Sequence, residues 1–292
     1  MTAISCNNLS KQYPGGVLAL SELTLEVEEG TVFGFLGPNG AGKSTTVRTL
    51  NGTLSATAGE FSFFGRQADG AEIRMISATL SETARMYEQL SAMENLAFFG
   101  TLYGMSVSDI RDRSRYLIER LGLEGRESDK LGTYSTGMKK RIQLARTLLH
   151  RPRILFLDEP TSGLDPEASR EVTDLIRDLA VSEGTTVFLC THNLPVAERV
   201  CDRVGFLEKG RLIASGSHEE LTRGIGWEQQ LELTLLSPGQ KEKRTESRPI
   251  ADIEDINRHL RAAMDDGNVV LESRLPQPSL EELYFAYLGV KK

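Results

Sequence analysis

A nine-residue stretch near the start of the chain constrains the fold more than any other feature. It fits the pattern G-x-x-x-x-G-K-[ST] of a phosphate-binding loop. The apolar run Thr31–Leu36 before it is short enough for a strand buried on both faces, and Thr46–Leu54 after it has apolar residues at helical spacing. The predicted order is strand, glycine loop, helix. The loop residues are Gly37, Pro38, Asn39, Gly40, Ala41, Gly42, Lys43, Ser44 and Thr45.

This order presents backbone N–H groups to a phosphate. The first turn of a helix has N–H groups without partners and a partial positive charge, and glycines let the loop turn its own N–H groups inward. Lys43 adds a full charge for the β and γ phosphates, and the Ser44 hydroxyl is placed to bind Mg²⁺. A glycine turn that merely precedes a helix would explain the glycines but not the Lys-Ser pair.

Two acidic residues end a second apolar run, Ile154–Leu157. Charged groups avoid interiors unless they are paired or bound to metal. In parallel α/β sheets ligands bind at the carboxyl ends of the strands, so this run would bring both acids to the phosphate loop. We expect Asp158 to hold Mg²⁺ through water and Glu159 to polarise the attacking water. The plainer alternative is that both acids only begin a solvated loop.

Composition narrows the cellular setting and the partners. The 292-residue chain has a net charge of -7 and scattered Lys and Arg residues, which argues against nucleic acid as the main partner. Three widely spaced cysteines without a C-x-x-C pair favour a reducing compartment, with neither a disulfide framework nor a zinc site. No signal peptide is evident, and no apolar run approaches the roughly 20 residues of a membrane span. We therefore expect a soluble, cytoplasmic chain that reaches a membrane only through a partner.

The pattern of elements predicts two domains. Short strands at 4–9, 17–20 and 23–27 predict an N-terminal mixed or antiparallel sheet beside a parallel nucleotide-binding sheet. A mostly helical stretch predicts a helical subdomain at about 82–152, within a first domain that covers 1–220. Residues 221–292 are predicted to form a small α+β lobe without recognisable chemistry, with a charged loop at 237–244.

Further motifs follow the phosphate loop in a fixed order. They are Tyr134–Arg141, Leu157–Thr161, Ser162–Asp165 and Thr191–His192. Together with the loop they resemble the motifs of ABC transporter ATPases, over about residues 3–220. The resemblance implies an α/β fold of the P-loop NTPase class, with a mixed parallel sheet, an N-terminal antiparallel β subdomain, a helical subdomain and a small C-terminal α+β appendage.

The resemblance also implies contacts with ATP at the phosphate loop's own site. Tyr13 resembles the aromatic residue that stacks on adenine, although a tyrosine in a turn is by itself more often a surface residue. His192 resembles the switch histidine that reaches the γ-phosphate, although a histidine after a strand is otherwise more often structural.

Other residues resemble those that act across a dimer of ATPase subunits. Ser135, Thr136 and Gly137 resemble the signature motif, which contacts the γ-phosphate of ATP held by the opposite subunit. Asp165 resembles the residue that couples the two sites, and its plain interpretation as a helix N-cap is equally good. The resemblance thus implies two ATP molecules sandwiched in a homodimer, or in a heterodimer with another ABC ATPase.

Two departures from the family pattern stand out. The signature has Tyr134, Thr136 and Met138 where many members have Leu, Gly and Gln. Glu82 stands where the family usually has the glutamine that senses Mg²⁺ and the membrane partner, and an ionised Glu82 can accept from a metal-bound water but cannot donate. Residues 80–96 and 278–283 resemble the branch that serves exporters of the ABC-2 type.

The interpretation that follows is an ATP-binding and ATP-hydrolysing subunit of an exporter, with Mg²⁺ as cofactor. Its membrane-spanning permease would be a separate chain, so this subunit would lie on the cytoplasmic face of the membrane. One alternative is a soluble ABC ATPase of translation or DNA repair, against which stand the single phosphate loop and the acidic charge. Another alternative is a regulatory subunit that hydrolyses ATP only weakly. A GTPase is a further alternative, but it would need an Asn-Lys-x-Asp motif that the chain lacks.

Overall fold

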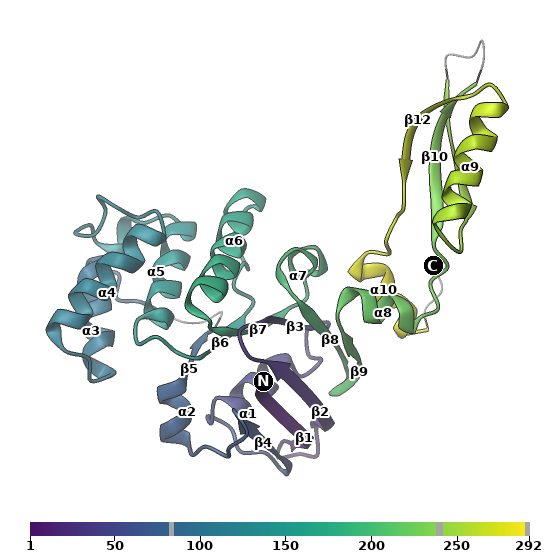
Figure 1. The fold of residues 1–292 in the computed structure, drawn as a ribbon. Coiled ribbons are helices and arrows are strands. Elements are labelled where there is room, and N and C mark those ends of the chain that lie inside the picture. The colour runs from purple at the N-terminus through teal and green to yellow at the C-terminus, as the bar shows by residue number, and fades with distance from the viewer. Residues whose placement is uncertain (82–84, 238–241, 290–292) are drawn as a thin grey trace. The chain divides into compact units, whose positions relative to one another are not determined.

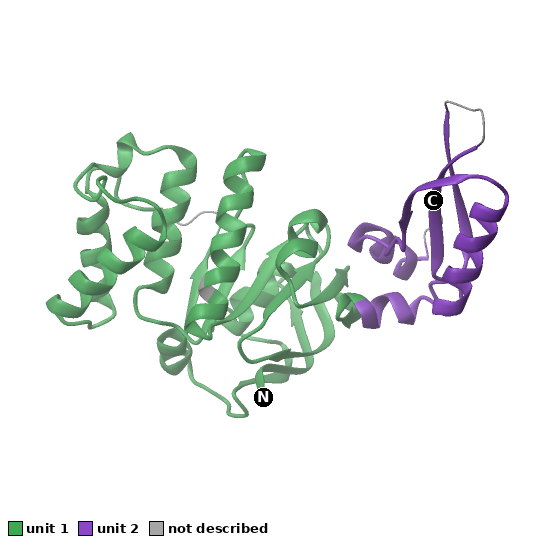
Figure 2. Ribbon diagram, turned by 45° about the horizontal axis from the view of Figure 1, so that its top comes forward, with its two compact units in different colours: residues 1–218 green, residues 219–292 purple. Residues whose placement is uncertain are grey.

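A computed structural model of the protein describes residues 1–81, 85–237 and 242–289 (Figure 1). The chain divides into two compact units, Met1–His218 and Glu219–Lys292 (Figure 2). Within the described residues, no helix combines the length and the apolar character that crossing a membrane requires.

The centre of the first unit is a sheet with the strand order β5-β6-β7-β3-β8-β9. Its strands are β3 (Val32–Leu36), β5 (Ser77–Leu80), β6 (Ile154–Asp158), β7 (Thr186–Thr191), β8 (Arg203–Glu208) and β9 (Arg211–Gly216). All neighbours are parallel except β8 and β9, which form an antiparallel hairpin. Every residue of β3 and β7 is buried, because layers cover both faces.

Alternate side chains of the central strands pack into two cores. On one face, phenylalanines such as Phe35, Phe156 and Phe188 pack with α1 (Lys43–Leu50) and the N-terminal sheet. On the other, Leu155 and Leu189 pack with the helical subdomain, α6 (Pro166–Glu183) and α7 (Leu194–Val200). The strand-loop-helix order around the phosphate loop is present, but the helix begins at Lys43 and not at Thr46.

The N-terminal sheet is antiparallel, with the order β2-β1-β4. Its strands are β1 (Thr2–Gln12), β2 (Leu18–Glu28) and β4 (Ala58–Phe63), and α2 (Gly70–Ile76) follows. The prediction of separate strands at 17–20 and 23–27 is wrong, because one strand covers both. Glu22 has a positive φ of 52°, and the pairing of β1 with β2 shifts register nearby, so a local irregularity breaks the pattern without ending the strand.

The helical subdomain consists of α3 (Ala92–Leu102), α4 (Val107–Arg120), the 3-10 turn Leu131–Thr133 and α5 (Thr136–Leu148), which lie together in Figure 1. Ser91 begins α3 with a capping box to Glu94. Asn95, on the first turns of α3, is fully buried and bonds the backbone N–H and C=O of Tyr87 together with the carbonyls of Leu90 and Ser91. This side chain therefore ties the segment before α3 to the helix.

The second unit has an α+β fold. Its antiparallel sheet has the order β11-β10-β12, formed by β10 (Gln230–Leu236), β11 (Lys243–Pro249) and β12 (Val269–Arg274). Its helices are α8 (His218–Gly224), which begins at the unit boundary, α9 (Ile253–Asp265) and α10 (Leu280–Tyr287). Leucines of β10 pack against α9 in a separate small core. The predicted charged loop at 237–244 ends earlier than expected, because β11 begins at Lys243. Lys243 pairs with Leu236 through the backbone, and this pairing does not require apolar side chains on the solvent-facing side.

Candidate functional site: a phosphate loop facing a carboxylate

The phosphate loop connects the end of β3 to the start of α1 and depends on glycine at two kinds of position. Gly40 and Gly42 have positive φ angles of 82° and 116°. Gly37 is enclosed by the neighbouring strand, where a Cβ atom would lie 2.2 Å from the Leu207 carbonyl oxygen. The N-cap of α1 is Gly42, which has no side chain to bond the N–H groups of the first turn. These N–H groups therefore remain suited to an anion.

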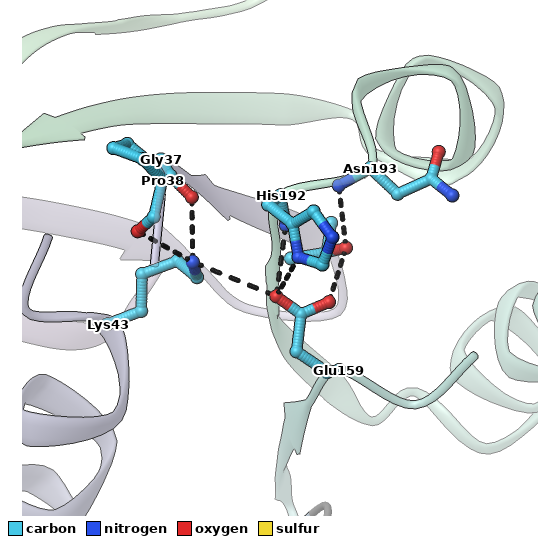
Figure 3. Close-up of polar contacts among 7 residues, drawn as sticks. Gly37, Pro38, Lys43, Glu159, His192 and Asn193 are labelled. Atoms are coloured by element: carbon cyan, nitrogen blue, oxygen red, sulfur yellow. Dashed lines mark hydrogen bonds and ion pairs between the residues drawn. The ribbon is translucent and has the colours of Figure 1, made fainter. Parts of the chain in front are cut away.

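Lys43 lies under the loop, with its side chain 7% exposed. Its Nζ donates to the carbonyl oxygens of Gly37, at 2.7 Å, and Pro38, at 3.2 Å (Figure 3). The same atom lies 3.7 Å from Oε1 of Glu159. Ser44 next to it is exposed and Thr45 is half-buried, so these hydroxyls lie at the surface of the loop.

Glu159 directly follows β6 and faces the loop from the carboxyl edge of the sheet. Its backbone has a positive φ of 49°, which is uncommon for a residue with a side chain, and its N–H donates to the Cys190 carbonyl at 2.9 Å. Its Oε1 accepts from the backbone N–H of His192 at 3.0 Å, and its Oε2 accepts from Oγ1 of Thr191 at 2.9 Å. The turn after β7 thus fixes the carboxylate.

His192 completes this arrangement with its ring. Its Nδ1 lies 2.8 Å from Oε1 of Glu159, and its side chain is 56% exposed (Figure 3). Because an ionised carboxylate only accepts, Nδ1 must carry the hydrogen of this bond. The carboxylate of Glu159 is therefore hydrogen-bonded to a proton-bearing imidazole and ion-paired with the ammonium of Lys43.

Asp158 is the last residue of β6 and is half-buried. It lies in register with Cys190 of β7. Burial raises the pKa of the Cys190 thiol well above its ordinary value, and the charge of Asp158 raises it further. Cys190 is therefore a neutral, packed side chain near the site and not a nucleophile.

Tyr13 lies beside the phosphate loop, although it is far from it in the sequence. Its hydroxyl is 3.4 Å from Oγ1 of Thr45, and Nζ of Lys11 lies 5.7 Å from the ring centroid. The ring is half-buried. The structure thus brings this predicted residue to the same place as the loop.

The predicted signature and coupling residues lie at the starts of two other helices. Ser135 caps α5 by accepting from the Met138 N–H at 3.2 Å, and both Ser135 and Thr136 are exposed while Gly137 is half-buried. Asp165 is exposed and caps α6. Among the described residues, no hydrogen bond joins residues 135–137 to the phosphate loop. Glu82 lies outside the described residues.

Thr191 belongs to the motif Thr191–His192, but the sequence alone indicates no role for it. The structure shows its hydroxyl between the Asn193 N–H and Glu159. The available signal was a hydroxyl residue directly after the buried apolar run 185–190 and directly before His192. No feature of the sequence predicts the positive φ of Glu159, because this backbone conformation arises from the turn that follows β6.

Comparison with known proteins identifies the family. The model of the ABC transporter family matches residues 20–162. The daunorubicin resistance ATP-binding protein DrrA3 of Streptomyces coeruleorubidus is 35% identical over 307 residues, which cover 99% of this chain and 96% of that protein. The Nod factor export ATP-binding protein I of Rhizobium johnstonii is 38% identical over 228 residues, covering 77% of this chain and 72% of the relative.

A solved structure shares the fold as well. The dimeric structure of a post-hydrolysis state of the ATP-binding cassette MJ0796, bound to ADP and Pi, superposes with a TM-score of 0.65 at 26% identity, covering 73% of this chain and 98% of the other. The predicted α/β fold class and the predicted resemblance are both confirmed. The chain belongs to the family of ABC transporter ATP-binding proteins.

Proposed function

We propose that this ABC ATPase drives an exporter of the ABC-2 type through a separate membrane-spanning subunit. The observation that carries the catalytic part is the position of Glu159, whose carboxylate lies 3.7 Å from the lysine of the phosphate loop. The transport part is supported by the relatives, one a daunorubicin resistance protein and the other a Nod factor export protein.

ATP would bind with its phosphates against the N–H groups of the loop and of α1. Lys43 would exchange its bonds to Gly37 and Pro38 for bonds to the β and γ phosphates, and Tyr13 would stack on adenine. The similar solved structure, an ATP-binding cassette bound to ADP and Pi, supports a nucleotide at this position.

The donor set near the loop fits Mg²⁺. Among the described residues, no group of three or more His, Cys, Asp or Glu could hold a metal by itself. Mg²⁺ is commonly bound by one or two protein ligands together with substrate phosphates and water. The exposed hydroxyl of Ser44 would bind the ion directly. Asp158 would bind it through water, and Glu82 would be a further ligand through water. The bound ion would neutralise charge on the phosphates.

Glu159 would accept hydrogen bonds from the attacking water as the general base, and His192 would contact the γ-phosphate. The 2.8 Å bond between them keeps both groups at the carboxyl edge of the sheet. When ATP replaces Glu159 as the partner of Lys43, Oε1 of Glu159 would lose one of its three partners and could accept from the water.

A second subunit would complete the site. Ser135, Thr136 and Gly137 would contact the γ-phosphate of the other subunit's ATP, and Asp165 would couple the two sites. The exposure of Ser135, Thr136 and Asp165 supports this proposal, as does the dimeric state of the similar solved cassette. The partner copy would be this chain or another ABC ATPase, and ATP would favour the closed dimer.

The membrane subunit would dock on the surface from Glu82 to Tyr103. Rings gather there: Tyr87 and Phe98 have centroids 5.0 Å apart, and the two side chains are 49% and 40% exposed. Exposed aromatic side chains are common at protein interfaces. This partner would hold the chain on the cytoplasmic face of the membrane.

Two measurements test this function. Purified wild-type protein should release phosphate from MgATP, and Lys43→Ala should abolish this release with loss of binding of a fluorescent ATP analogue. The tagged protein should also copurify with an integral membrane protein from detergent-solubilised membranes, and Tyr87→Ala with Phe98→Ala should weaken the copurification while phosphate release continues. Absence of ATP hydrolysis would refute the first part, and copurification with ribosomes instead would refute the second.

A further inference from the structure

We propose that Thr191 is the positioning residue for Glu159: it holds Oε2 of the carboxylate so that Oε1 faces the phosphate loop. This inference rests on the proposed hydrolysis of ATP, in which Glu159 is the general base. It assigns a role to a residue that touches neither the nucleotide nor water in that reaction, and it distinguishes the two oxygens of the base.

Thr191 is part of the central sheet. It is the last residue of β7, lies in register with Leu36 at the end of β3, and is fully buried. The neighbouring strand β6 pairs with β7 and delivers Glu159. The hydroxyl therefore projects from the sheet framework and not from a loop.

The hydrogen bonds of this hydroxyl have a fixed direction. The backbone N–H of Asn193 can only donate, and it reaches Oγ1 of Thr191 at 3.0 Å. A hydroxyl has one hydrogen, and an ionised carboxylate can only accept. The Thr191 hydrogen is thus directed to Oε2 of Glu159, at 2.9 Å.

The two oxygens of Glu159 have different surroundings. Oε1 is shared by three groups: the His192 N–H at 3.0 Å, the His192 ring Nδ1 at 2.8 Å and Lys43 at 3.7 Å. Among the described residues, Oε2 bonds to Thr191 alone. Lys43 and the exposed His192 ring can turn toward a nucleotide, whereas Thr191 is buried in the sheet, so Oε1 can lose two of its three partners while Oε2 keeps its bond.

This difference predicts what removal of the hydroxyl does. Thr191→Val keeps the shape of the side chain but removes the bond to Oε2, which leaves the carboxylate held only through Oε1. A lost hydrogen bond to a charged group predicts that kcat falls by about tenfold. The KM for ATP should change by less than about twofold, since Thr191 does not contact the nucleotide. Thr191→Ser restores the donor and should retain most of the wild-type kcat.

The test compares phosphate release by wild type, Thr191→Val and Thr191→Ser, each alone and combined with Glu159→Gln. Binding of a fluorescent ATP analogue and thermal unfolding are measured on the same samples, and Thr191→Ala replaces the valine variant if that protein does not fold. We expect the loss of kcat only where Glu159 is present, with unchanged analogue binding and rescue by serine. If wild type itself does not hydrolyse ATP, the proposed function fails, whatever Thr191 does.

Three results would overturn the role of Thr191 while leaving the function intact. They are a kcat unchanged in the variant without the hydroxyl, a serine variant as slow as the valine variant, and an equal fold loss in the Glu159→Gln background. The last result would show that Thr191 acts through another group, because two residues that act through one step are not additive.

Discussion

Replacing Glu159 by glutamine removes the proposed general base with almost no change of shape. The amide oxygen can still accept from either the His192 N–H or the Thr191 hydroxyl, so the turn after β7 should persist. What disappears is the negative charge 3.7 Å from Lys43 and the capacity to accept a proton. Loss of a positioned base predicts a fall in kcat of about 10² to 10⁴, which corresponds to about 3 to 5 kcal/mol in the activation free energy.

The same substitution should not weaken nucleotide binding. Glu159 and the triphosphate are both negative, so the variant loses a repulsive charge and frees Lys43 from a competing partner. Phosphate release at saturating MgATP gives kcat, and titration with a fluorescent ATP analogue gives affinity. Glu119→Gln, on the exposed face of α4, is the matched control and should behave as wild type. Hydrolysis within threefold of wild type in Glu159→Gln would refute the assignment of the base.

Three further predictions concern the framework around the site. Gly37→Ala should lower stability by about 1 to 3 kcal/mol through overpacking and abolish binding of the ATP analogue, because its Cβ would lie 2.2 Å from a backbone oxygen. Wild-type affinity for the analogue and a wild-type melting temperature would contradict this prediction. Asn95→Ala should lower the unfolding free energy by about 1 to 3 kcal/mol, since buried backbone groups lose their partners, and an unchanged denaturant midpoint would count against it. His150 stacks on Tyr103, and burial lowers the pKa of its imidazole from the ordinary value of 6.5. The unfolded chain therefore binds the proton more readily, and the free energy of unfolding should fall as pH drops below about 6.5. Denaturant titrations at several pH values should show a weaker pH dependence for His150→Phe, and an equal pH dependence in both proteins would refute this cause.

The parts that sequence could predict are those set by local order. Glycines followed by Lys43, and an apolar run followed by Asp158, fix a loop and an acid at strand ends, and parallel pairing brings strand ends to one edge. The bond between Glu159 and Thr191 could not be predicted, because it joins residues 32 positions apart through the register of β6 and β7. The continuity of β2 across Glu22 was missed for a related reason: pairing with β1 carries the strand through an irregularity that local pattern treats as a break.

The contacts of Lys43 have a consequence for which anions the phosphate loop favours. Its charge is balanced by two carbonyl dipoles and a carboxylate, so it attracts an anion less strongly than an ammonium without these partners would. A simple anion such as sulfate can reach the N–H groups but must compete with Glu159 for the lysine. A ligand that carries several linked phosphates presents more negative charge to the lysine, so we expect the ion pair with Glu159 to disfavour a single phosphate relative to a triphosphate.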